Sequence, residues 1–232
     1  MNKEQRDLRD ALDLSLFNTT FFVGAPPRSG NTYLRYVLKD AYSNPIKDSG
    51  SLIKNNHSSS YALNQALSTE SVAPIFICPI RDPYDTLKSK LVRTFFEWDT
   101  APNVIEHAPS VDDLCLYWEI LLIDPSKFCL VDFKELVVDK DKVVSKIDER
   151  YPEIKIYKNP TPATNEQLLA EMSKEDGDKY GDNIKLYLSS AHIPRSKSEY
   201  SDAAEELLSS PAYARRLDYL YVMYKELLDL TI

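Results

Sequence analysis

The stretch that decides the fold is FFVGAPPRSGNTYLRYVL, residues 21–38. Residues 19–24, TTFFVG, are β-branched or aromatic up to Gly24, which predicts a short buried strand over this range. From Asn31 the apolar residues take a helical spacing. They are Leu34, Val37, Leu38 and Ala41. The residues between, APPRSG, therefore predict a tight turn from a strand into the N-terminus of a helix.

A turn of this kind can bind a terminal phosphate. The first N–H groups of a helix have no partner within it, and the helix dipole adds partial positive charge there. Gly30 allows the backbone to approach an anion, Ser29 and Thr32 offer hydroxyl donors, and Arg28 adds full charge with a forked set of donors. The alternative is an ordinary strand-to-helix turn made of common turn residues.

The loop differs from the ATP-binding pattern G-x-x-x-x-G-K-[ST]. Asn31 stands after Gly30, where that pattern has its phosphate-gripping lysine, and the cation Arg28 precedes the glycine instead. This difference counts against a kinase or ATPase.

The remainder of the chain alternates strand and helix patterns, which predicts one α/β domain over residues 1–232 with three layers: a mainly parallel sheet and helices on both faces. A helix is expected from Ser110, because Ser110 and Asp113 form a capping-box-like pair. Further strands are expected at residues 73–80 and 127–133. Further helices are expected at residues 81–98 and 139–151, from about Asp202, and from Pro211. Loops or polar interruptions are expected at residues 43–60, 157–166 and 173–182.

Composition describes an ordinary globular chain with an acidic surface. It has 232 residues, 43% of them hydrophobic, with 28 Lys plus Arg against 36 Asp plus Glu and a net charge of −8. This balance disfavours coating nucleic acid or anionic membrane, although one small basic pocket remains compatible with it. No apolar stretch is long enough to cross a bilayer, and the first residues lack the core of a secretory signal, so we expect a cytoplasmic protein. The cysteines are three in number, Cys78, Cys115 and Cys129, and are expected to be buried reduced thiols rather than zinc ligands or a disulfide pair.

A second stretch, PIRDPYDTLKSKL, joins the first in a resemblance. FFVGAPPRSGNTYLRYVL resembles the 5′-phosphosulfate loop of the sulfotransferases that use 3′-phosphoadenosine 5′-phosphosulfate (PAPS), which typically reads P-[KR]-S-G-T-T-W-L. The second stretch is similar to the 3′-phosphate motif of the same family, R-[DN]-x-x-D-x-x-x-S. Arg81 and Ser89 are eight residues apart, so an Arg at a strand end and a Ser two turns into the next helix can meet on one phosphate. Taken alone, RDPYD is equally an ordinary helix start capped by Asp82 or Asp85.

The similarity covers roughly residues 17–150. LIKNNH resembles the family's K-x-H element and places His57 as its histidine, although Lys54 lies three residues before it rather than two. FCLVDFKELVVDKDKVVSKI resembles the family's strand and helix with the pattern fxYEDLxxDP, and Phe133 stands where many members have Tyr.

The resemblance implies a P-loop NTPase-like fold and transfer of a sulfuryl group from PAPS to a hydroxyl or amine, with no metal. Arg28 and the backbone amides of Ser29, Gly30, Asn31 and Thr32 would hold the 5′-phosphosulfate, while Arg81 and Ser89 would hold the 3′-phosphate. Tyr33 would stack on adenine or else serve as a core aromatic, and Arg195 would close the 3′-phosphate site.

His57 would be the general base, since its unperturbed pKa near 6.5 suits neutral pH, with His107 and His192 as alternatives. Lys54 would assist the leaving group or else be simply solvated. The expected acceptor is a small molecule or a glycan, with neither nucleic acid nor membrane as partner. A small-molecule kinase and a catalytically silent nucleotide-binding module of the same fold remain as alternatives.

Overall fold

The computed structural model describes residues 21–26, 28–42, 53–56, 75–98, 104–152, 154, 158–180 and 199–232. Its elements in chain order are β1 (Phe21–Gly24), α2 (Asn31–Ala41), β2 (Ile53–Asn56), β3 (Ile75–Ile80), α4 (Pro83–Trp98), α5 (Val104–Ile123), the 3₁₀ turn η2 (Pro125–Lys127), β4 (Phe128–Asp132), α6 (Phe133–Val138), α7 (Lys140–Arg150), α8 (Asn165–Tyr180), α10 (Glu199–Leu208) and α11 (Pro211–Asp229).

The four strands form one parallel sheet in the order β2-β1-β3-β4. The strand that comes first in the chain therefore lies inside the sheet, with β2 on one side and β3 on the other. The direction of winding reverses between β1 and β3. In open α/β sheets, ligands bind outside the carboxyl ends of the strands at such a reversal. The predicted α/β class with a parallel sheet is confirmed.

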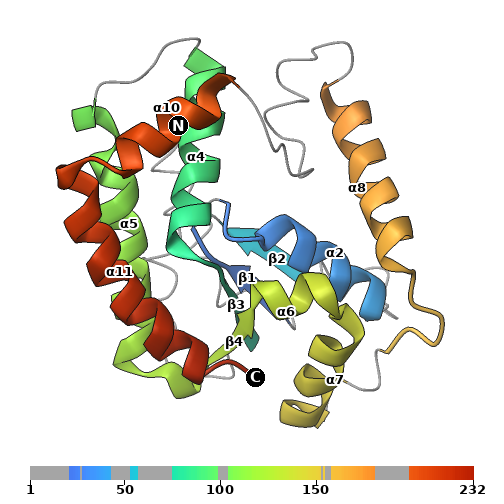
Figure 1. Ribbon diagram of the computed structural model, residues 1–232. Coiled ribbons are helices and arrows are strands. Elements are labelled where there is room, and N and C mark those ends of the chain that lie inside the picture. Colours follow the sequence, from blue (N-terminus) through green and yellow to red (C-terminus); the bar gives the residue numbers. More distant parts are fainter. Residues whose placement is uncertain are drawn as a thin grey trace, which may run out of the picture.

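Helices cover both faces of the sheet, so the predicted three layers are also confirmed (Figure 1). Successive side chains of a strand point to opposite faces, and on β3 this sends Phe76, Cys78 and Ile80 into one hydrophobic cluster and Ile77 into the other. The first cluster is filled from α4, α5, α10 and α11, and the second from α2, α6, α7 and α8.

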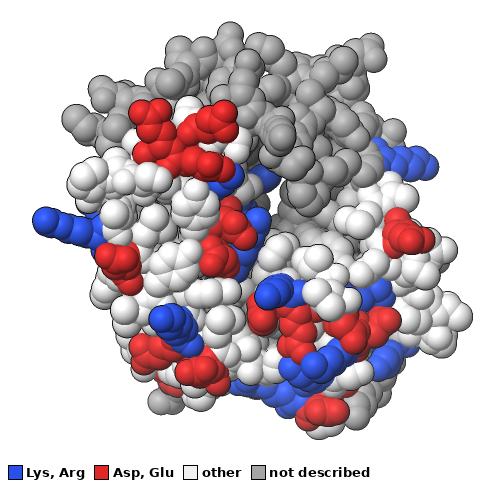
Figure 2. All heavy atoms as spheres, viewed as in Figure 1, with Lys and Arg blue, Asp and Glu red and all other residues white. Residues whose placement is uncertain are grey.

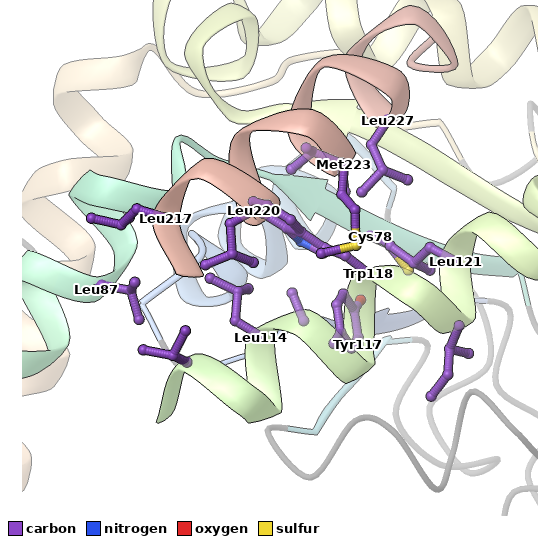
Figure 3. Packing of buried hydrophobic residues seen from close by; sticks show 14 of the residues in the cluster. Cys78, Leu87, Leu114, Tyr117, Trp118, Leu121, Leu217, Leu220, Met223 and Leu227 are labelled. Carbon is purple, nitrogen blue, oxygen red and sulfur yellow. The ribbon is translucent and has the colours of Figure 1, made fainter. Parts of the chain in front are cut away.

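The C-terminal helix is an integral part of the first cluster. Figure 3 shows its Leu220 and Met223 directed toward Leu114 and Trp118 of α5, while Leu217 lies on the side of α4. Burial of each such side chain contributes roughly 1.5–3 kcal/mol. The last third of the chain, where the sequence resemblance fades, therefore completes the core beside β3 and β4.

One strand that the sequence did not predict, β2, lies within residues 43–60, which were expected to be mostly loop; the rest of that range lies outside the described residues. Its sequence, IKNN, is short and polar, and it pairs in register with β1 from Phe21↔Ile53 to Gly24↔Asn56. Its place at the end of the strand order accounts for the missed signal, since edge strands are commonly short and polar.

Three helical segments differ from the prediction. The helix expected from Ser110 begins at Val104, so Ser110 lies inside α5 and does not cap it. The polar interruption expected at 173–182 is helical as far as Tyr180, the end of α8. The short helix α6, which directly follows β4, was not predicted.

Pro79 was expected at the C-terminal end of its strand, and it occupies the next-to-last position of β3. The pairing of β1 with β3 ends at Ile77, so Pro79 has a strand partner only on the β4 side, at Val131. A missing N–H is tolerated there because the ladder on one side has already ended.

The three cysteines are free thiols, as expected. Burial raises the pKa of Cys78 and of Cys129 to about 12, and burial likewise raises that of Cys115 to about 11, which leaves all three in the unreactive thiol form near neutral pH. Within the described helices, none combines the length and apolar character that a membrane span requires. Among the residues that the structure describes, no group of three or more His, Cys, Asp or Glu is placed to hold a metal ion.

Candidate anion-binding site

The turn between β1 and α2, residues 24–31 and hereafter the anion loop, has an unusual backbone. Arg28 and Gly30 both take left-handed conformations, with φ of 74° and 102°. Two hydrogen bonds brace the loop from inside: the Ser29 N–H donates to the carbonyl of Pro26 at 3.3 Å, and the side-chain amide of Asn31 donates to the carbonyl of Ala25 at 2.5 Å. The side-chain amide of Asn31 thus stabilises the loop itself. The Ser29 N–H, which was predicted to bind the anion, already donates to the carbonyl of Pro26 in this turn.

The start of α2 carries no side-chain cap. Gly30 is the N-cap residue, its carbonyl accepts from the N–H of Leu34 at 3.0 Å, and no acidic residue lies in the first turn. The first N–H groups of this helix point out of its positive end without an internal partner. The helix start thus lacks a carboxylate of its own, and binding of an anion there stays a prediction.

The two predicted phosphate motifs lie in contact. Arg28 Nε donates to Ser89 Oγ at 2.9 Å, although 61 residues separate them in the chain. Arg81 Nη1 donates to the backbone carbonyl of Arg28 at 2.8 Å. Arg81 follows β3 and Arg28 follows β1, so both cations lie where the winding of the sheet reverses. Whether these side chains bind a nucleotide stays a prediction; their convergence is a property of the fold.

Phe133 lies between the anion loop and Arg81. A Cβ atom placed on Gly30 would lie 2.3 Å from two carbon atoms of the Phe133 ring, so only glycine fits there. The guanidinium carbon of Arg81 lies 5.1 Å from the centre of the same ring, within cation–π range. Burial lowers the pKa of Arg81, while the charges of Asp85 and Asp82 oppose that shift.

Sequence reasoning noted Phe133 only as a phenylalanine in place of a common tyrosine and missed this contact. The strand register explains the contact: Ile80 of β3 pairs with Asp132 of β4, and Arg81 and Phe133 are the residues that directly follow this pair. It becomes visible only when β3 and β4 are known to be adjacent.

The turn after β3 is held by the last helix. Asp82 accepts the N–H of Asp85 at 3.1 Å, which makes Asp82 the cap of α4. Its two carboxylate oxygens also each lie 3.3 Å from the hydroxyl of Tyr221 on α11. Burial and the neighbouring Asp82 raise the pKa of Tyr221 to about 12, so this hydroxyl stays protonated and donates. No sequence pattern indicated Tyr221, because its role depends on how α11 packs.

Tyr33 is in the second hydrophobic cluster, 8% exposed. Its hydroxyl donates to Asn165 Oδ1 on α8 at 2.8 Å, and burial raises its pKa. This is the core placement that the sequence left open, and the proposed stacking on adenine stays a prediction.

The other predicted residues are only partly described. Lys54 pairs with Phe22 in the backbone register of β2 and β1, but its side chain lies outside the described residues. His57, His192 and Arg195 also lie outside them, as does the side chain of His107 in α5. The roles given to these residues stay predictions.

Charges of both signs share the face of the molecule that contains the site. Figure 2 shows basic and acidic side chains side by side near the middle of this face and again over α6 and α7. Over α6 and α7 these include Glu135 paired with Lys142 at 2.7 Å and with Lys146 at 2.8 Å. Positive and negative charges are therefore interspersed on this face.

The chain has only distant similarity to known proteins. No family model matches the chain, and no curated protein matches it. Among solved structures, mouse sulfotransferase SULT7A1 complexed with PAP aligns with 90% of this chain and 93% of its own, at 13% identity and a TM-score of 0.39. Similarity at this level does not indicate what this chain binds.

Proposed function

We propose that the chain is a PAPS-dependent sulfotransferase that transfers a sulfuryl group to a hydroxyl or amine of a small-molecule or glycan acceptor. The observation that carries the proposal is the convergence of Arg28, Ser89 and Arg81 at the reversal between β1 and β3. Two motifs that each favour a phosphate are brought together by one sheet edge, which suits a nucleotide with phosphate at two positions.

The two halves of the nucleotide have distinct candidate partners. Arg28 and the uncapped N-terminus of α2 offer charge and N–H donors to the 5′-phosphosulfate. Arg81 and Ser89 offer a guanidinium and a hydroxyl to the 3′-phosphate. The side chain of Asn31, which stands where an ATP-binding loop has lysine, is turned back onto the carbonyl of Ala25. This arrangement supports PAPS over ATP as the donor.

PAPS supplies the sulfuryl group, and adenosine 3′,5′-bisphosphate leaves. Arg28 stabilises the charge that grows on the leaving oxygen, a kind of interaction worth several kcal/mol in an enclosed site, roughly 3–4 kcal/mol per donor. His57, as general base, takes the proton of the acceptor; it directly follows Asn56, which pairs with Gly24 at the start of the anion loop. Lys54 assists the leaving group, and Arg195 closes the 3′-phosphate site.

Calorimetric binding of three nucleotides tests the donor. The protein should bind adenosine 3′,5′-bisphosphate more tightly than adenosine 5′-phosphate or ATP with magnesium. Replacing Arg81 by Ala should weaken the bisphosphate about 10- to 150-fold and adenosine 5′-phosphate much less, because a charged hydrogen bond contributes about 1.5–3 kcal/mol.

Arg150→Ala is the matched control, since Arg150 also donates to backbone carbonyls, those of Ser126 and Phe128, but at the opposite end of β4. Its nucleotide affinities should equal those of the unaltered protein. Tighter binding of ATP with magnesium would favour the kinase. Equal losses for both adenosine nucleotides in Arg81→Ala would remove Arg81 from the 3′-phosphate. Screening of acceptors with labelled PAPS then identifies the second substrate.

A further inference from the structure

The ring of Phe133 touches both halves of the candidate site. It lies against Gly30 of the anion loop, where an added Cβ would meet it at 2.3 Å. The same ring lies 5.1 Å from the guanidinium carbon of Arg81. Phe133 is half-buried at the first position of α6, directly after β4. It thus packs against the proposed 5′-subsite and the proposed 3′-subsite together.

The position of Phe133 is set by rigid parts of the fold. The pairing of Ile80 with Asp132 brings the residues that follow them, Arg81 and Phe133, to neighbouring strand ends. Asp132 then caps α6 by accepting the N–H of Lys134 at 2.8 Å, which fixes where the helix begins. The ring is therefore held by a strand register and by a helix cap.

The contact gives Arg81 an orientation. A guanidinium is planar and its donors lie in that plane, so its use depends on how the plane is turned. One N–H is directed at the carbonyl of Arg28, 2.8 Å away, and the ring of Phe133 attracts the cation through its negative face. Carbonyl and ring both contact the guanidinium and restrict the side chain of Arg81 before any ligand binds.

We propose that Phe133 is a positioning residue that makes the site selective for a 3′-phosphorylated nucleotide, by holding the guanidinium of Arg81 ready for the 3′-phosphate. This inference rests on the proposed function. A ligand without a 3′-phosphate gains nothing from the orientation of Arg81, so Phe133 affects the selectivity for that group more than general nucleotide affinity.

The measured quantity is the selectivity ratio, the Kd of adenosine 5′-phosphate divided by the Kd of adenosine 3′,5′-bisphosphate, from calorimetry on the full chain. Phe133→Leu should lower this ratio about 2- to 30-fold, the range that corresponds to the free energy of a cation–π contact. Phe133→Tyr keeps the ring face and should keep the ratio within about twofold of the original.

Two further variants separate positioning from packing. Trifluorophenylalanine at position 133 keeps the shape of the ring but weakens its negative face, so it should lower the ratio in a protein of unchanged melting temperature. Phe128→Leu makes the Leu substitution in the fully buried core at the other end of β4, and it should lower the melting temperature without changing the ratio.

The outcomes distinguish this inference from the proposed function. If the unaltered protein shows no preference for the bisphosphate, the proposed function and this inference fail together. If the preference is strong but the fluorinated ring leaves it unchanged, the role of Phe133 is overturned while the proposed function stands. A lowered ratio with the fluorinated ring and a preserved ratio in Phe128→Leu supports the inference, whether or not Phe133→Leu folds.

Discussion

Two strand-to-helix turns of the same parallel sheet begin their helices in opposite ways. At the turn from β4 to α6, the Asp132 carboxylate accepts the N–H of Lys134, and Glu135 lies in the first helical turn. At the turn from β1 to α2, the cap position is Gly30, with no side-chain cap and no acidic residue in the first turn. One helix start supplies its own anion, and the other supplies none.

The turn from β4 to α6, hereafter the structural turn, is capped by the chain's own carboxylate, whereas the anion loop has no such cap. A carboxylate cap satisfies orphan N–H groups and stabilises a helix by about 1 kcal/mol. The anion loop lacks the stabilisation that a cap provides, and it also holds Arg28 and Gly30 in left-handed conformations. Its first helical turn therefore carries no carboxylate that would compete with a bound anion. Equivalent substitutions at the two turns test this difference.

The largest effect is expected for Gly30→Ala. The substitution combines a φ of 102° with a Cβ contact of 2.3 Å to Phe133, so it should lower the free energy of unfolding by about 2–4 kcal/mol and weaken nucleotide binding. Thermal or denaturant unfolding measures the first, and calorimetry the second. In a Phe133→Ala background the steric part should disappear and only the backbone cost remain. A loss below about 0.5 kcal/mol in the single variant would contradict the geometry of the loop.

The next effect concerns binding and not stability. Arg28→Ala should weaken adenosine 3′,5′-bisphosphate and adenosine 5′-phosphate alike, each about 10- to 150-fold, because both carry the 5′-phosphate that Arg28 is proposed to hold. Calorimetry against Arg35→Ala provides the matched control, since Arg35 lies on α2 and its guanidinium faces the ring of Tyr36 at 5.2 Å. Equal affinities in the two variants would remove Arg28 from the site.

The smallest effect is expected at the structural turn. Asp132→Ala removes the carboxylate that caps α6 and should lower the free energy of unfolding by about 1 kcal/mol, while the Kd of adenosine 5′-phosphate, which makes no use of the contact between Phe133 and Arg81, changes less than about threefold. Asp132→Asn retains an acceptor oxygen and should restore most of the stability. A loss of nucleotide binding as large as in Arg28→Ala would mean that both turns contact the ligand, and the distinction between them would be wrong.

Much of the fold follows from local patterns. The β-branched and aromatic residues of FFVG and the apolar spacing from Leu34 to Ala41 predicted β1 and α2, and the turn residues between them predicted the loop. The polar strand β2 was missed because its pairing with β1 defines it and its composition does not. The start of α5 was misplaced because Ser110 is a good cap that the helix extends past, to Val104.

For the site, the sequence by itself determined which residue types are available as candidates for binding an anion: the cation and glycine of the loop, and the Arg and Ser spaced eight apart after the strand predicted at 73–80. Only the tertiary structure decided that Arg28 meets Ser89, that Arg81 holds the carbonyl of Arg28, and that Phe133 lies against both Gly30 and Arg81. Helical spacing and turn chemistry act over a few residues, so they are written in the local sequence. Strand order and register arise from pairing and burial between distant segments, and those place the residues of the site together.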